Sequence, residues 1–269
     1  MLNNIAIGQY IPGTSFLHRM DPRMKIILLI AYMIVTFGVS SYFSYLLLYV
    51  FTFLVIVFSG IPVRYTLKGL KPILFVCVFT TLINLFTIKT GTLLISWHFI
   101  QIHADALVLS TKVLLKLILL VLSASLLTLS TTPILLTDGL EKLLKPIGIL
   151  GISSHEIAMM MTIALRFIPT LVEETDRIMK AQASRGADFD TGNVLQKTKS
   201  FLPVIIPLIT GAFRRATELA DAMESRCYRG GEGRTRLRQL KFTKLDLICL
   251  IAFAIIMAGA FYISQIALF

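Results

Sequence analysis

Five long apolar runs constrain the fold of this chain more than any other feature of its sequence. They fall at about 26–40, 43–60, 70–88, 106–129 and 245–268. A run of about 18 or more apolar residues is typical of a membrane-spanning helix. The first run is short for a span, and only Gly38, Ser40 and Ser41 separate it from the second, which predicts a tight helical hairpin. The runs therefore predict an all-α membrane protein with about five transmembrane helices.

The low share of charged residues excludes an ordinary soluble domain. Charged residues make up 15% of the chain and hydrophobic residues 56%, whereas soluble domains carry roughly 25% charged residues. The three cysteines, Cys77, Cys227 and Cys249, are widely spaced. This spacing predicts neither a disulfide framework nor a metal site.

The positions of Lys and Arg predict the orientation of the spans. Three lie before the first run and three in the link 61–71, whereas the link 89–105 carries only Lys89. Cytoplasmic loops of membrane proteins carry the excess of positive charge. We therefore expect the N-terminus and the link 61–71 on the cytoplasmic side. Lys112 and Lys116 fall within the fourth run, and we interpret them as side chains that reach toward the membrane surface.

Segment 131–244 differs in kind from the rest of the chain. It holds 29 charged residues among 114, while the other 155 residues hold 12. We expect a membrane domain of four spans at 1–130, a cytoplasmic segment of long coupling helices at 131–244, and a last transmembrane helix at 245–269.

Two apolar pieces interrupt the charged segment, Gly148–Leu171 and Phe201–Phe213. The first contains Arg166, and an Arg at the middle of the bilayer costs about 2.5–3.5 kcal/mol on insertion scales. The second is too short to span, and Pro203 and Pro207 predict a break in it. We expect both pieces to pack on the membrane domain from the cytoplasmic side rather than to cross it.

A short motif occurs twice within the charged segment. Ser184-Arg185-Gly186 ends the helix-like run LVEETDRIMKAQAS, and Ser225-Arg226-Cys227 ends ATELADAMES 41 positions later. Gly186 suits a left-handed C-terminal cap. An Arg in the last turn of a helix gains about 0.3–1 kcal/mol from the helix dipole, which explains most such residues. The duplication favours a further role, since Arg suits a bidentate contact with a carboxylate of a partner.

Four longer segments, together with the two tripeptides, point to a known family. They are YIPGTSFLHRMDPRMKI (Tyr10–Ile26), TPILLTDGLEKLLKPI (Thr132–Ile147), ALRFIPTLVEETDRIMKAQASRGADF (Ala164–Phe189) and ELADAMESRCYRGGEGRT (Glu218–Thr235). With them the chain resembles the transmembrane T component of energy-coupling-factor (ECF) vitamin transporters. The tripeptides look like the paired X-Arg-X signature of that family, with Cys227 as a variant in the second copy.

The resemblance implies a non-catalytic subunit of an ATP-driven importer in the bacterial cell membrane. Arg185 and Arg226 would end two coupling helices that sit in grooves on two ATP-binding-cassette subunits, and these ATPases, not this chain, would bind ATP and Mg²⁺. Their closure would move the helices and, through them, a membrane-embedded S component that releases a vitamin or metal ion inside. The implied coupling residues are Ser184, Arg185, Gly186, Ser225, Arg226 and Cys227.

Other patterns in the sequence carry less weight. His155-Glu156 begins a zinc-protease pattern, but position 159 is Met rather than the second His. Arg229–Arg234 is glycine-rich, yet no strand is predicted before it and no G-K-[ST] follows. The sequence has no Walker A motif, and its basic residues give little support for nucleic-acid binding. Asp21, with Pro22 after it, is predicted to cap the first helix.

Two other functions stay open at this point. A stand-alone secondary transporter would need a midplane site with broken helices or intramembrane acids, and no acidic residue falls near the centre of a predicted span. A membrane scaffold would use the Ser-Arg repeat to dock a different cytoplasmic partner. Counter-transport by the purified chain alone would favour the first, and vitamin uptake that depends on this chain would exclude the second.

Overall fold

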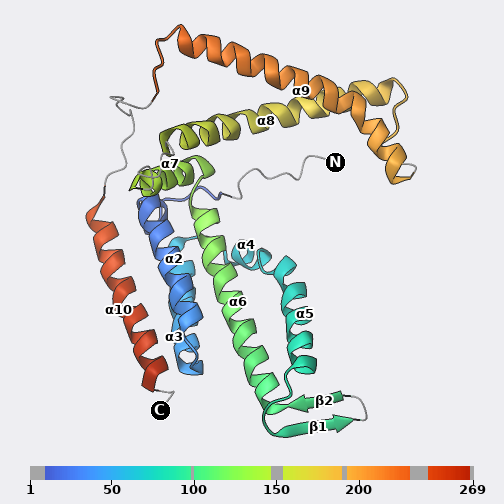
Figure 1. The fold of residues 1–269 in the computed structure, drawn as a ribbon. Coiled ribbons are helices and arrows are strands. Elements are labelled where there is room, and N and C mark those ends of the chain that lie inside the picture. Colours follow the sequence, from blue (N-terminus) through green and yellow to red (C-terminus); the bar gives the residue numbers. More distant parts are fainter. Residues whose placement is uncertain (1–9, 98–99, 147–153, 190–192, 231–241, 267–269) are drawn as a thin grey trace. The chain divides into compact units, whose positions relative to one another are not determined.

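The computed structural model describes residues 10–97, 100–146, 154–189, 193–230 and 242–266 (Figure 1). Most of these residues are helical, and the rest include one two-stranded hairpin. The chain divides into two compact units. The first, here the apolar unit, holds Gly8–Leu140 and Leu240–Phe269, and the second, here the charged unit, holds Glu141–Gln239.

Five helices of the apolar unit match the five apolar runs to within four residues at each end. They are α2 (Pro22–Gly38), α3 (Tyr42–Ser59), α5 (Lys71–Thr87), α6 (Ala104–Ser130) and α10 (Lys244–Ile266). The unit also contains two short helices: α1 (Phe16–Arg19) precedes α2, and α4 (Val63–Lys68) lies between α3 and α5. The predicted all-α membrane fold is confirmed, although which residues lie in the cytoplasm stays a prediction.

The outer faces of these helices carry large, exposed, apolar side chains. Phe43 in α3 is 72% exposed and Phe75 in α5 is 77% exposed, as expected of surface that contacts lipid. By length and composition, α3, α6 and α10 can each cross a membrane, and Ile73–Thr87 of α5 is a shorter apolar helix. The chain is therefore a multi-pass membrane protein.

Many buried polar side chains of the apolar unit are bonded to one another or to helix backbones, whereas Thr66 Oγ1, Ser110 Oγ and His103 Nδ1 have no partner within the described residues. The Tyr32 hydroxyl lies 2.7 Å from Thr52 Oγ1, and the Ser44 hydroxyl donates to the Ala260 carbonyl at 2.8 Å. They adjoin a buried apolar cluster drawn from α2, α3, α6 and α10. Since lipid offers no hydrogen bonds, such internal pairing is what a spanning bundle requires.

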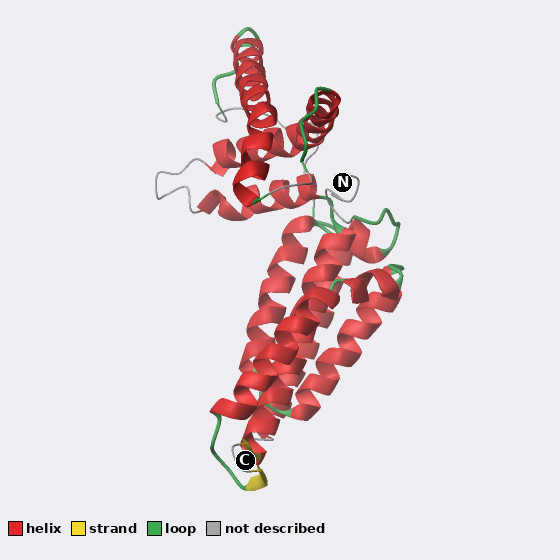
Figure 2. Ribbon diagram, turned by 90° about the vertical axis from the view of Figure 1, so that its right-hand side faces the viewer, coloured by secondary structure: helices red, strands yellow, loops and turns green. Residues whose placement is uncertain are grey.

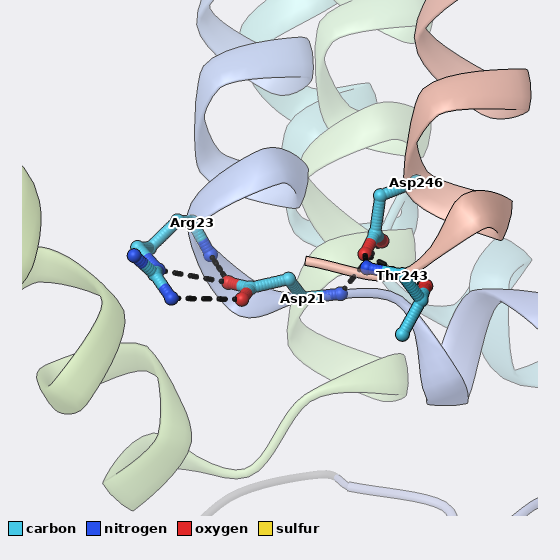
Figure 3. Close-up of polar contacts among 4 residues, drawn as sticks. All are labelled: Asp21, Arg23, Thr243 and Asp246. Atoms are coloured by element: carbon cyan, nitrogen blue, oxygen red, sulfur yellow. Dashed lines mark hydrogen bonds and ion pairs between the residues drawn. The ribbon is translucent and has the colours of Figure 1, made fainter. Parts of the chain in front are cut away.

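The carboxylate of Asp246 joins the beginnings of α2 and α10 (Figure 3). One oxygen accepts from the Asp21 amide at 2.9 Å, and the other accepts from the Thr243 amide at 2.7 Å and its hydroxyl at 2.8 Å. Asp21 in turn caps α2, as predicted, by accepting from the Arg23 amide at 2.9 Å. Asp246 is 1% exposed, so this carboxylate is a buried junction between two helix N-termini.

Lys112 and Lys116 reach from α6 to the turn between α2 and α3. Lys116 Nζ donates to the Phe37 carbonyl at 3.0 Å, and Lys112 Nζ lies 5.5 Å from the centre of the Tyr42 ring. Both cations thus lie at the ends of neighbouring spans, where the side chains were expected to extend.

A β-hairpin, which the sequence reasoning missed, precedes α6. Strands β1 (Leu93–Trp97) and β2 (Ile100–His103) pair antiparallel, with Leu93 opposite His103 and Ile95 opposite Ile102. Figure 2 shows them in yellow at one end of the bundle of the apolar unit. The alternation in ISW and IQI is the signal for strands, but each strand is too short to separate it from an ordinary loop.

The charged unit is built on two helices of 31 residues each, α8 (Ser154–Ser184) and α9 (Val194–Glu224). Helix α7 (Pro133–Leu144) precedes them in the chain, and all but its last four residues belong to the apolar unit. The predicted break at Pro203 and Pro207 is wrong, because α9 continues through both. The two prolines lie four residues apart and are exposed, so the carbonyls that lose an amide partner lie on a face open to other donors.

Length and composition also select His155–Ser184 of α8 as a candidate span. Its mean hydropathy is lower than that of α3, α6 and α10, and only 6% of its most apolar stretch of 18 residues is buried within the structure. The helix carries Arg166 and, further on, Glu173, Glu174, Asp176 and Arg177. Since these charges are costly in a bilayer, we still predict that α8 is a cytoplasmic helix.

Candidate functional site

Helix α8 ends in a Schellman motif at the first tripeptide. The Gly186 amide donates to the Ala183 carbonyl at 2.9 Å, and the Ala187 amide donates to the Gln182 carbonyl at 3.0 Å. This pair of hydrogen bonds defines the motif and satisfies two carbonyls at the helix end. Gly186 has φ +88°, the left-handed conformation that was predicted for it, and Arg185 is therefore the C-cap residue.

Helix α9 ends in the same motif at the second tripeptide. The Cys227 amide donates to the Glu224 carbonyl at 2.8 Å, and the Tyr228 amide donates to the Met223 carbonyl at 3.0 Å. Each donor and acceptor lies 41 positions after its counterpart in the first motif. The repeat in the sequence is thus a repeat of backbone geometry, with Arg226 at the C-cap.

The two caps differ in the residue that takes the left-handed conformation. Cys227 has φ +56° and is the one non-glycine residue with positive φ among those that the structure describes. A side chain in this region costs roughly 1–2 kcal/mol. The second cap therefore keeps the geometry of the first at an energetic cost.

Exchanging the residue types should change the stability of each cap in opposite directions. We expect Cys227→Gly to slow amide hydrogen exchange at residues 227–228, and Gly186→Ala to accelerate it at 186–187, each about 2- to 5-fold. The strain removed or added, roughly 1–2 kcal/mol, is partly offset by the opposite change in the entropy of the unfolded chain, which leaves roughly 0.5–1 kcal/mol. Exchange followed by mass spectrometry measures both effects. Faster exchange at the second cap in Cys227→Gly would contradict this account.

Both arginine side chains are exposed. Within the described residues, neither Arg185 nor Arg226 takes part in an ion pair. Open space surrounds Gly186, since a Cβ placed there would meet nothing within 4 Å. Each helix end therefore presents, on a fixed backbone, a guanidinium that has no ion-pair partner in the described ranges of the chain.

An ion pair holds α8 and α9 together where they cross (Figure 1). The Arg215 guanidinium donates to Glu174, and about a quarter of each side chain is exposed. Gly211 lies beside this pair, and a Cβ there would make ordinary van der Waals contact with Glu174 Oε1 at 3.4 Å. The sequence reasoning missed the pair, yet Glu174 and Arg215 are also 41 positions apart. Opposite charges at one repeat position are the signal that could have revealed it.

The segment after the second cap lies against the beginning of α8. The Tyr228 hydroxyl donates to Met159 Sδ at 2.8 Å and lies 3.4 Å from His155 Nε2. The other ring nitrogen of His155 lies 3.3 Å from Glu141 Oε1. The end of α9 therefore lies beside the beginning of α8, and the two helices run antiparallel. Arg185 and Arg226 lie on opposite sides of the crossing. Each is about 17 Å from the crossing along its own helix.

A groove of about 510 Å³ adjoins the second cap. Its lining includes Met159, Leu219, Arg226, Cys227 and Tyr228. Of the glycine-rich stretch Arg229–Arg234, the part from 231 onward lies outside the described residues. His155 is engaged with Tyr228 and Glu141 in this part of the unit, which gives it a structural role.

Comparison with known proteins covers nearly the whole chain. The family model described as cobalt transport protein, CbiQ, matches residues 13–237. The energy-coupling factor transporter transmembrane protein EcfT of Ruminiclostridium cellulolyticum is 57% identical over 248 residues, which cover 92% of each protein. The protein of the same name from Bacillus subtilis is 42% identical over 263 residues, which cover 98% of this chain and 99% of the relative. The matched region contains both tripeptides.

Proposed function

Since this chain belongs to the EcfT transmembrane proteins of energy-coupling factor transporters, we propose that it couples two ATP-binding-cassette subunits to a substrate-binding S component. The chain is a transport subunit and works with other subunits of its transporter. In this proposal its own residues carry out no catalysis, and ATP and Mg²⁺ bind to the ATPase subunits. The cargo is a vitamin or a metal ion, chosen by the S component.

The observation that carries the proposal is the matched pair of helix ends. Two long helices end in the same hydrogen-bonded cap, and each cap presents an exposed arginine. A guanidinium that is held at a helix end can form a bidentate contact with a carboxylate in a groove of a partner. Two equivalent ends suit two equivalent or closely similar subunits, as a pair of ATPases provides.

The apolar half of α9 is the surface that we assign to the S component. Ile206, Ile209 and Phe213 are exposed, Phe213 by 72%. An apolar surface of this kind on a helix rich in charge elsewhere marks a contact with protein or membrane. Because Arg215 on the same helix is tied to α8, movement of the helix ends would be passed to whatever contacts this surface.

The composition of a purified complex tests the proposal directly. We expect the affinity-tagged chain, extracted from its own membrane in mild detergent, to bring down two ATP-binding-cassette subunits and a small membrane protein. Mass spectrometry identifies them, and a tagged multi-pass protein of unrelated function serves as the control. Recovery of the chain without any ATPase would rule out the coupling function.

A further inference from the structure

The short helix α4, which links α3 to α5, lies in a cluster of exposed cations. Arg64 and Lys68 are one turn apart on α4, and Lys71 is the first residue of α5. All three side chains are exposed. Residues four apart share one face of a helix, so Arg64 and Lys68 can act on the same ligand. The coupling function makes no use of this cluster.

In the part of the chain that the structure describes, no acidic side chain pairs with these cations. The sequence has no Asp or Glu between Asp21 and Asp105, and within the described residues none of the three cations forms an ion pair. Helix α4 contacts α6, where Ser125 lies beside Gly69. Asp105, the acidic residue of α6, is 20 residues from Ser125. That separation is about 30 Å along the helix, well beyond the screening length of about 8 Å at physiological salt.

The cluster rests on a fixed part of the fold. Thr66, in the middle of α4, is fully buried, and Ile61 before the helix is 3% exposed. Gly60, with φ +69°, turns the chain from α3 into this connection. Lys68 Nζ lies 5.2 Å from the centre of the Tyr65 ring, which restrains the side chain. The charges are therefore presented on an anchored turn.

Apolar side chains surround the cations on the same turn. Val63, Tyr65 and Leu67 are each between 40% and 50% exposed. Exposed Tyr and aliphatic side chains beside Lys and Arg are typical of the boundary between headgroups and acyl chains. The link lies on the side of the membrane where we expect the excess of positive charge, and the cytoplasmic leaflet carries anionic lipids.

We propose that Arg64, Lys68 and Lys71 form a binding site for the headgroup of an anionic phospholipid of the phosphatidylglycerol type. The guanidinium and the two ammonium groups contact the phosphate, while Val63 and Leu67 contact the upper acyl chains. A soluble phosphate compound would leave those apolar side chains in water, so the occupant is a lipid. The site is independent of the two helix caps.

Native mass spectrometry of the full chain in mild detergent tests this site. We expect dioleoylphosphatidylglycerol to remain bound at least about 10-fold more than dioleoylphosphatidylcholine, because each cation near a charged surface is worth about a factor of five. Glycerol phosphate in excess should not displace the lipid. Equal retention of the two lipids, or displacement by glycerol phosphate, would overturn the proposal without recourse to any variant.

Two matched variants locate the effect. Arg64→Gln/Lys68→Gln/Lys71→Gln should lose the preference for the anionic lipid, whereas Arg177→Gln/Lys180→Gln/Lys199→Gln, which removes the same charge from exposed positions on α8 and α9, should keep it. A charge-preserving variant, Arg64→Lys/Lys68→Arg/Lys71→Arg, should also keep it. Equal loss in both Gln variants would assign the preference to net charge and refute a site at α4.

Discussion

Replacing Arg185 and Arg226 together by Glu is expected to abolish ATP-dependent uptake while the protein still inserts in the membrane. Each guanidinium lies at a helix end and has no ion-pair partner within the described residues, so reversing its charge removes nothing from the fold that the structure shows. In the proposed coupling function, the change turns an attractive contact with a carboxylate of the ATPase into a repulsive one. Loss of one partner from a buried charge pair at an interface costs about 2–5 kcal/mol.

Each single replacement should therefore weaken co-purification of the ATPases by about 30-fold or more, and the double variant should eliminate it. Uptake of a radiolabelled substrate and the amount of ATPase recovered with the chain are the two measurements. Arg177→Glu, an exposed charge reversal on α8, is the matched control and should leave both unchanged. Normal association of the ATPases with the double variant would falsify the coupling role.

Replacing Asp246 by Ala is expected to destabilise the apolar unit more than any other single change in the contacts described here. The change leaves the buried Asp21 amide without its acceptor and removes the bonds that the carboxylate accepts from the amide and hydroxyl of Thr243, an exposed residue. One unpaired buried donor and the loss of three charge-assisted hydrogen bonds together cost about 3–5 kcal/mol. For a protein of this size, that lowers the unfolding temperature by roughly 10 °C.

Thermal unfolding in detergent measures the effect of Asp246→Ala. Asp246→Asn keeps one carbonyl oxygen as an acceptor and should lose less. Asp221→Ala is the matched control, because Asp221 is exposed on α9 and surface substitutions usually change stability by under about 0.5 kcal/mol. If Asp246→Ala unfolded at the temperature of the wild type, the junction would have no part in holding α2 to α10.

The spans were predictable because a bilayer imposes one simple demand on sequence, a long apolar run for each helix. The same rule says nothing about which helices touch. The hydrogen bond between Asp21 and Asp246 joins residues 225 positions apart, and no local sequence pattern predicts such a pair. Pro203 and Pro207 misled the prediction because the rule against internal proline assumes that the exposed carbonyls find no other donor.

The two arginines became candidates for the site through repetition rather than through chemistry. A single Ser-Arg-Gly at a helix end is ordinary, and only the second copy made Arg185 and Arg226 candidates. The repeat predicted the cap of Gly186 but not that Cys227 would take the same conformation. Glu174 and Arg215 obey the same interval, yet their pairing depends on the antiparallel crossing, which the sequence does not show.

The ion pair at the crossing of α8 and α9 lies at the same distance from the arginine at the end of each helix. Arg185 follows Glu174 by 11 residues, and Arg226 follows Arg215 by 11 residues. The two helix arms between the ion pair and the arginines therefore have the same length. A force of given size on either arginine produces the same turning moment. In the proposed coupling function, neither ATPase subunit would then have a geometric advantage over the other, and a difference between their contributions would come from the ATPases themselves.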